Sequence, residues 1–321
     1  ELNAMRRRAV ERLEALREKP RVYVKRSGVD PYADAAGVAA ASGKSAAEAG
    51  KPKLTALCRT LEQVREAVRQ QADLVYADFE FIKQFPAAVE SARAAGVPIA
   101  LATPRIHMPG ETGYFQNIAK LRPDAVLVRN TGALYYFMRK RREEPDRYGF
   151  DLIGDFSLNA ANHKTVGLLL DAGCDLVTPS YDLNIQQMID LLRRTDNAKL
   201  EIVIQQHMPM FHTEHCVYCT FLSEGTDYTN CGRPCEKHRA SLQDRVGMSH
   251  PVRVDEGCRN TVYNAIEQSG AEYIRQFLEL GVRSYRVEFL EESGEKVAEV
   301  LDLYRKALSG TISGTQVWKT L

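Results

Sequence analysis

The sequence has no long apolar run, no excess of charge of one sign and no signal-peptide pattern. Its 43 Lys and Arg residues balance 42 Asp and Glu residues, so the net charge of +1 gives no general attraction to nucleic acid or acidic membranes. No apolar stretch is long enough to cross a bilayer. Because its clustered cysteines carry no secretion signal, we expect a cytoplasmic protein without a membrane partner. Residue 1 is Glu rather than Met, so we also expect a fragment or a processed chain.

Familiar catalytic patterns are missing as well. No His-Glu-x-x-His motif is present, which argues against the usual zinc metalloprotease. No Ser-His-Asp grouping or catalytic Cys-His context stands out. No Gly-rich phosphate loop follows the first predicted strand, which disfavours a doubly wound open sheet.

Short aliphatic or β-branched runs alternate instead with helical segments. Strands that alternate with helices, without hairpin signals, indicate parallel pairing. Eight such units match a (β/α)8 barrel of TIM type, an α/β fold, in both number and length. The predicted strands are residues 54–58, 74–79, 98–106, 125–130, 150–159, 175–182, 200–207 and 283–290. Predicted helices include residues 61–71, 85–96, 164–173 and 184–194.

The barrel is predicted to span residues 53–310. Within it, residues 208–260 form a long cysteine-rich insertion after strand seven, and residues 311–321 form a C-terminal tail. Residues 1–52 are interpreted as the remnant of a preceding region, with an amphipathic helix over 1–18 and a short strand over 19–26. Residues 27–51, rich in Ala, Gly and Ser, bury too little apolar surface to fold and are predicted to be a linker.

Polar side chains end most of the predicted strands. In a barrel these positions build the active site, and burying them is costly unless they meet a ligand or one another. From this set we take Asp155 and Asn159 as catalytic candidates. The substrate-binding candidates are Arg105, Arg129, Asn130, Ser157, Ser180 and Glu288. Arg105 and Arg129 suggest an anionic small molecule, because guanidinium groups suit carboxylates. Alternatively, each arginine pairs with Asp78 or Glu80.

Five of the seven cysteines fall within 43 residues, at Cys216, Cys219, Cys231, Cys235 and Cys258. Thiolates two or three residues apart can turn toward one ion, so a metal or iron–sulfur centre is the first hypothesis. Sulfur ligands suit both zinc and iron–sulfur centres, and one thiol is surplus for either. Disulfides or buried thiols are the alternative. His207 and His212 lie beside the cluster and are further catalytic candidates, as acid and base near neutral pH.

At these residues the sequence resembles peptidase family U32, the collagenase-like protease family. The resemblance rests on His212 with Cys216 and Cys219, on Cys231 to Cys235, and on Asp255 to Cys258. Residues 155–159 with Asn162 resemble the family's strand-five element. The resemblance covers about residues 53 to 310. One departure is the spacing of the first two cysteines, which many members separate by six residues and this chain by two.

The resemblance implies an oxygen-sensitive 4Fe-4S cluster held by four cysteines, with zinc as the alternative. Matching the elements assigns Cys216, Cys219, Cys231 and Cys258, with Cys235 as the alternate ligand. It further implies oxygen-independent hydroxylation of an RNA base or an aromatic small molecule. An anionic co-substrate such as prephenate would then donate the oxygen, and RNA is a possible partner. Two other hypotheses stand beside this one, namely a collagenase-like peptidase and a zinc-stabilised binding module.

Overall fold

The computed structural model describes residues 2–20 and 50–321. Helix α1 (Leu2–Glu18) forms where an amphipathic helix is predicted, and all its side chains are exposed. The predicted strand over 19–26 and the predicted linker over 27–51 lie almost entirely outside the described residues. No helix in the described part of the chain combines the length and the apolarity needed to cross a membrane.

Within the described residues, eight parallel strands form the body of the molecule, and each overlaps a predicted strand. Their order in the sheet is β6-β5-β4-β3-β2-β1-β11-β7. The strands are β1 (Lys53–Cys58), β2 (Leu74–Ala77), β3 (Ile99–Ala102), β4 (Ala125–Val128), β5 (Asp151–Gly154), β6 (Leu176–Val177), β7 (Glu201–Thr213) and β11 (Ser284–Glu288).

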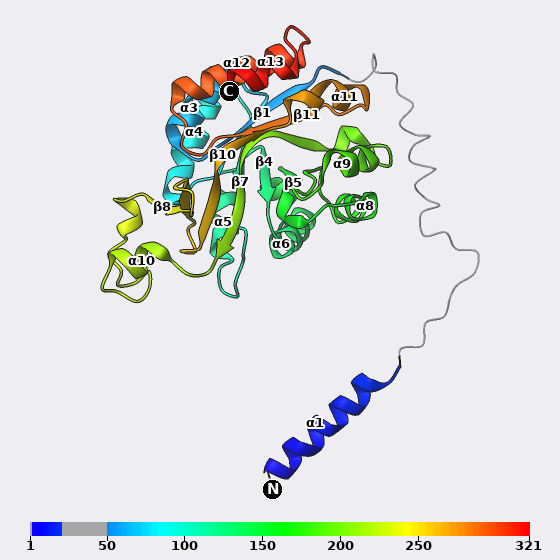
Figure 1. Cartoon of the computed structure of the whole chain (residues 1–321), viewed down its shortest axis with the longest axis vertical. Coiled ribbons are helices and arrows are strands. Elements are labelled where there is room, and N and C mark those ends of the chain that lie inside the picture. Colours follow the sequence, from blue (N-terminus) through cyan, green and yellow to red (C-terminus); the bar gives the residue numbers. More distant parts are fainter. Residues whose placement is uncertain (1, 21–49) are drawn as a thin grey trace, which may run out of the picture.

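The parallel sheet curls strongly (Figure 1). A single parallel bridge joins Val177 at the end of β6 to Leu200, directly before β7. The concave side holds a small apolar group with several alanines, at Leu57, Tyr76, Ala100, Ala102, Ala125, Leu127 and Ile153. The fold is therefore α/β with a curled, parallel-rich sheet.

Helices follow most of the strands and cover the convex side, where the main apolar core lies. Several begin at well-formed caps, such as Thr60 with Gln63 before α3. The helices are α3 (Leu61–Arg69), α4 (Phe85–Ala95), α5 (Gly113–Lys120), α6 (Thr131–Glu143), α7 (Pro145–Tyr148), α8 (His163–Asp171), α9 (Ile185–Leu192), α11 (Ile274–Glu279) and α12 (Gly294–Leu308). Short 3-10 turns are η1 (Ile82–Gln84), η2 (Phe156–Leu158), η3 (Asn197–Lys199) and η5 (Ala271–Tyr273).

The cysteine-rich segment is built on an antiparallel extension of the same sheet. Strand β7 continues past the parallel region and pairs with β10 (Asn260–Ser269), which pairs with β9 (Ser249–Val254) and then β8 (Ala240–Gln243). Helix α10 (Val217–Leu222) and the turn η4 (Pro234–Glu236) complete the segment. The long loop expected after strand seven thus has regular structure over much of its length.

The C-terminal residues differ from the predicted tail. Residues 311–321 include helix α13 (Gly314–Thr320), which begins at a capping box formed by Ser313 and Gln316. Val317 is fully buried, so this helix docks on the body through an apolar contact.

Candidate functional site

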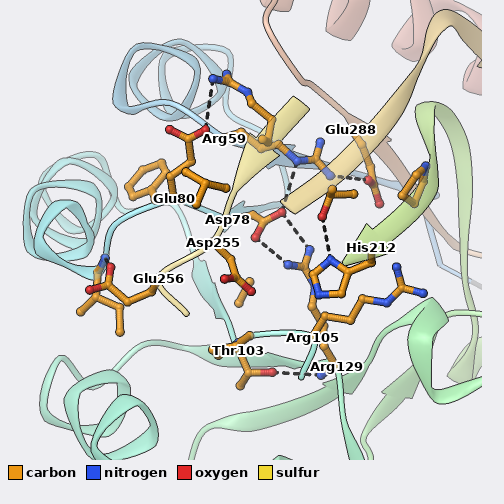
Figure 2. Close-up of a pocket in the computed structure, with 18 of the residues that line it drawn as sticks. Arg59, Asp78, Glu80, Thr103, Arg105, Arg129, His212, Asp255, Glu256 and Glu288 are labelled. Carbon is orange, nitrogen blue, oxygen red and sulfur yellow. Dashed lines mark hydrogen bonds and ion pairs between the residues drawn. The ribbon is translucent and has the colours of Figure 1, made fainter. Parts of the chain in front are cut away.

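Three arginines and three carboxylates alternate in a closed ring at the carboxyl ends of the parallel strands. In order round the ring the ion pairs are Arg286–Asp155 (2.6 Å), Asp155–Arg129 (2.9 Å), Arg129–Asp78 (2.6 Å), Asp78–Arg59 (3.2 Å), Arg59–Glu288 (3.1 Å) and Glu288–Arg286 (3.2 Å). Figure 2 shows the part of this ring that joins Arg129, Asp78, Arg59 and Glu288. Since charges of this kind are costly to bury unless paired, the alternation explains how the apolar strands can end in them.

A fourth carboxylate lies below the ring. Glu201, at the start of β7, is fully buried and pairs with Arg286 at 3.2 Å. It also accepts hydrogen bonds from the hydroxyl groups of Thr55, Tyr76 and Ser284. The ring is therefore anchored in the interior of the curled sheet.

The ring fixes the charge state of its members. Burial alone would raise the pKa of Asp155, but the guanidinium groups of Arg286 and Arg129 outweigh it and bring this pKa to about 2. The pKa of Asp78 is likewise lowered, because Arg129 and Arg59 outweigh the effect of burial. Asp155, a catalytic candidate from the sequence, is thus a permanently ionised partner of two arginines.

All three guanidinium nitrogens of Arg129 are engaged by carboxylates of the ring. Its Nη1 and Nη2 donate to the two oxygens of Asp78 at 2.6 and 2.9 Å, and its Nε donates to Asp155 at 2.9 Å. The alternative weighed from the sequence, an ion pair with Asp78, is what the structure contains. Glu80, the other partner considered, lies instead against Arg239 and Arg253.

Arg105 differs from its neighbours. Among the described residues it has neither an ion pair nor a hydrogen bond, and its guanidinium lies over the ring of Phe156 at 5.2 Å. Phe156 stacks in turn on Tyr181, with ring centroids 3.9 Å apart. Burial and the nearby charge of Arg129 lower the pKa of Arg105. Arg105 lines a pocket at the mouth of the curled sheet together with Asp78, Phe156 and His212, and we call it the mouth pocket. Arg105 is therefore the cation of the mouth pocket that is available to an anion.

His212 lines the same pocket (Figure 2). Its Nδ1 lies 2.8 Å from the hydroxyl oxygen of Thr261, while its buried Nε2 has no hydrogen-bond partner in the described structure. Burial, with the positive charges of Arg105 and Arg129, lowers the pKa of His212 to about 4. The imidazole is therefore neutral near pH 7, with one free nitrogen facing the pocket.

Of the remaining candidates from the sequence, three lie in a groove beside the mouth and one lies outside it. Asn130, Ser157 and Asn159 line a shallow groove with Arg105 and His212. Asn130 also caps α6 and donates to the carbonyl of Pro104, and Ser157 donates to the carbonyl of Arg129. Ser180 is buried and contacts Asp182, outside the lining of the pocket. Asn159 is left-handed, with a φ of 55°, and ends the turn η2.

His207 lies apart from this group. It does not line the mouth pocket, and its Nε2 is 3.3 Å from Glu292 and 3.7 Å from Glu267. Burial would lower its pKa, but the two glutamates outweigh it and raise the pKa to about 10. The structure therefore does not bring the predicted acid and base, His207 and His212, to one point.

All five clustered cysteines line a second pocket, and all are free thiols. Burial first, and then the neighbouring thiols of Cys216, Cys235 and Cys231, raise the pKa of Cys258 to about 11. A small apolar group holds the segment together, with Tyr218 donating to the carbonyl of Val252 at 2.8 Å. The alternative of disulfide bonds is not what the structure contains.

Local backbone geometry serves this thiol pocket. Cys258 has a φ of 60°, which residues with a Cβ rarely adopt. A Cβ on Gly225 would lie 2.6 Å from the Cα of Cys231, so only glycine permits this approach of the two chain segments. Such constraints are typical of positions that orient functional groups.

The two pockets share a wall. Residues 254–256, at the end of β9, line both the mouth pocket and the thiol pocket. Asp255 has one carboxylate oxygen that is buried without a hydrogen-bond partner. The thiols therefore lie next to the mouth, as expected from the sequence position of the cysteines.

A sequence model described as peptidase family U32 matches residues 59–320, which is most of the chain. The chain belongs to peptidase family U32. The resemblance drawn from the cysteines and from residues 155–159 is thereby confirmed.

Solved structures with a similar fold include another U32 protein. The U32 peptidase Mk0906 has 12% sequence identity and a TM-score of 0.43, covering 76% of this chain and 95% of its own. Thiamine phosphate pyrophosphorylase from Pyrococcus furiosus has 9% identity and a TM-score of 0.43, covering 81% and 97%. The 3-hexulose-6-phosphate synthase from Salmonella typhimurium has 14% identity and a TM-score of 0.41, covering 78% of this chain and 98% of its own. No curated protein matches the sequence.

Three members of the charge network were missed by sequence reasoning. Arg59 directly follows β1, so its position at a strand end was a usable signal. Arg286 lies two residues before Glu288, a candidate from the sequence, on β11 and therefore shares the inner face of the sheet with it. Glu201 gave no signal, because it begins its strand rather than ending it.

Proposed function

We propose that this U32 family protein is an iron–sulfur enzyme that hydroxylates an RNA base or an aromatic small molecule without using oxygen. An anionic co-substrate such as prephenate would bind Arg105 at the mouth pocket. The observation that carries this proposal is the wall of residues 254–256 shared by the thiol pocket and the mouth pocket. It puts a centre held by the thiols beside the place where a substrate would bind.

The frame of this site is interpreted as a (β/α)8 barrel. The parallel bridge between Val177 and Leu200 supports this interpretation, because it connects the two ends of the run of eight parallel strands. A barrel puts its reacting groups at the carboxyl ends of the strands, where the charge ring lies. The ring would then serve as a rigid floor for the substrate.

The thiol pocket suits a cluster better than a single zinc ion. A tetrahedral zinc ion with four thiolates would bring the sulfurs to about 3.8 Å from one another. Among the described residues, no three of the cysteine sulfurs lie within 4.8 Å of one another. The wider spread favours a cubic 4Fe-4S cluster, whose chemistry would be electron transfer or binding of a substrate oxygen.

We assign the ligands as Cys216, Cys219, Cys231 and Cys258, with Cys235 as the alternate ligand. All five thiols line the thiol pocket. After burial, Cys231 and Cys216 raise the pKa of Cys219, and Cys216, Cys235 and Cys231 raise the pKa of Cys258, so these thiols lie near one another. The match to the family's cysteine elements supports Cys219 rather than Cys235 as the fourth ligand.

The mouth pocket offers groups that suit the two proposed ligands. The guanidinium of Arg105 would take a carboxylate, because no protein carboxylate pairs with it in the described structure. Phe156 and Tyr181 line the same pocket and would give an aromatic substrate an apolar wall. His212 Nε2 is placed to accept a proton from a bound substrate.

Anaerobic purification tests the proposal. A brown protein with about four iron and four sulfide per chain is expected. Incubating the reduced protein with RNA and prephenate without oxygen should add one oxygen atom to a nucleoside, detected by mass spectrometry of the digested RNA. A colourless protein with one zinc per chain would contradict the proposal and favour the zinc-stabilised binding module.

A peptidase is the second candidate, because the family is named for that activity. His212 beside Thr261 is the described pair that most resembles a base with a hydroxyl nucleophile. However, no carboxylate orients the free Nε2 of His212 in the described structure, and a triad needs such a group. Cleavage of gelatin that is lost in the Thr261→Val variant would support the peptidase instead.

A further inference from the structure

Outside the thiol pocket, the structure holds a second group of potential metal ligands. His207 on β7, Glu267 on β10 and Glu292 after β11 each offer one atom, and the three atoms lie within 4.8 Å of one another. None of these residues lines the mouth pocket or the thiol pocket. This group is therefore separate from both the charge ring and the cysteines.

Each of the two glutamates has one oxygen held by a neighbour and the other directed at the histidine. The Oε2 of Glu267 accepts a hydrogen bond from Gln205 at 2.8 Å, and the Oε2 of Glu292 accepts one from the amide of Leu290. The remaining oxygens, both Oε1, lie 3.7 and 3.3 Å from His207 Nε2. Ligands about 2.1 Å from one ion would be separated by similar distances, about 3.0 to 3.5 Å.

The histidine is oriented as a metal ligand should be. Its Nδ1 lies 2.8 Å from the carbonyl oxygen of Asn264 and can only donate to it. That hydrogen bond fixes the tautomer and leaves Nε2 as the nitrogen that faces the glutamates. A backbone carbonyl holding the far nitrogen is a common feature around metal-bound histidines.

One of these atoms is buried and contacts only the histidine in the described structure. The Glu292 side chain is 8% exposed, and its Oε1 has no hydrogen bond of acceptable geometry in the described structure. An unsatisfied buried carboxylate oxygen is costly unless something else binds it. Glu267 is 28% exposed, so an ion could enter from its side.

From this geometry we propose that His207, Glu267 and Glu292 bind a divalent transition-metal ion, separate from any centre on the cysteines. One nitrogen and two carboxylate oxygens suit Mn²⁺, Fe²⁺ or Zn²⁺, with further positions open to water. Without the ion, the imidazole lies between the two glutamates.

Mn²⁺ is the probe of choice, because thiolates compete poorly for this hard ion. The anaerobically purified protein is titrated with Mn²⁺ at pH 8, and free Mn²⁺ is followed by its electron paramagnetic resonance signal. We expect about one tightly bound ion per chain. Replacing a direct ligand in Glu267→Gln should weaken binding by more than about tenfold.

Glu299→Gln is the matched control, since Glu299 is 69% exposed on α12 and pairs only with Lys296 in the described structure. It should bind Mn²⁺ as the native protein does. Glu267→Gln is nearly isosteric and partly exposed, so circular dichroism should show an intact fold. Absence of bound Mn²⁺, or equal binding by the native protein and Glu267→Gln, would overturn the proposal and leave His207 as a protonated link between two glutamates.

Discussion

Arg129 and Asp78 form a two-pronged ion pair, with nitrogen–oxygen distances of 2.6 and 2.9 Å, at the centre of the mouth of the curled sheet. The pair comes from the ends of β4 and β2, so it ties together strands that are not adjacent in the sheet. Because the third nitrogen of Arg129 binds Asp155 on β5, one side chain links three strand ends. Arg129 is thus a structural member of the site, and ligand binding falls to Arg105.

Removing Arg129 should therefore destabilise the fold. Arg129→Ala leaves Asp78 and Asp155 partly unpaired, with side chains 16% and 0% exposed. Breaking a buried pair in this way costs about 3–5 kcal/mol. Chemical denaturation followed by circular dichroism measures the loss. Arg139→Ala is the control, because the exposed Arg139–Glu143 pair should contribute little to stability. Equal losses in the two variants would contradict the structural role of the ring.

The parallel strands could be predicted because each is buried on both faces and so is an apolar run in the sequence. The ends of the strands could not be predicted. The polar residues that follow each strand turn into the mouth and look like part of the strand in the sequence, although they do not pair with a neighbouring strand. The predicted strand over 175–182, for example, is reduced to Leu176–Val177. The antiparallel region depends on the pairing of β10 with β7, which joins residues far apart in sequence such as Asn260 and Thr213, whereas β8, β9 and β10 follow one another as hairpins.

The candidate site was predicted in part for the same reason. Strand ends identify which residues reach the mouth, so Asp155, Arg105 and Arg129 were found. They do not show which charges neutralise one another, because that depends on pairing between distant strands. Arg286 and Glu201 were missed, although they carry the inner part of the network. His207 is separated from His212 because β7 continues as an extended strand to Thr213, and residues five positions apart on a strand lie roughly 16 Å apart; the sequence predicted this strand to end at residue 207.

Arg105→Ala should weaken binding of the anionic co-substrate without affecting the fold. Losing a charge-assisted hydrogen-bonding group costs about 1.5–3 kcal/mol, or about 10- to 100-fold in affinity. Calorimetric titration of the anaerobic protein with prephenate measures this effect. Arg275→Ala is the control, because Arg275 is 91% exposed on α11. An unchanged affinity in Arg105→Ala would show that the anion binds elsewhere.

Single cysteine replacements should separate the four proposed ligands from the surplus thiol. Cys219→Ser should lose most of the iron and the visible absorption of the anaerobic protein, because a cluster with three thiolates is held less firmly. Cys235→Ser should keep both, since four other thiols line the pocket. The two variants differ by the same atom exchange, which makes each the control for the other. Retention of iron in Cys219→Ser with loss in Cys235→Ser would make Cys235 the fourth ligand.

The neutral state of His212 should be visible as a pH dependence of stability. Its pKa is lowered to about 4 in the folded protein, against about 6.5 in an unfolded chain, first by burial and then by Arg105 and Arg129. Between these values the unfolded chain binds a proton that the folded protein does not. Stability contributed by the neutral ring is therefore present above pH 6.5 and lost as the pH falls toward 4.

Compared with the His212→Gln variant, the equilibrium constant for folding of the native protein should fall by less than about tenfold per pH unit in this window, because the ring is only partly buried. Denaturation midpoints of both proteins from pH 4 to pH 8 measure the difference, and the effects of other titrating groups cancel between them. Parallel curves would mean that His212 titrates normally and that its Nε2 is not a free base at the mouth.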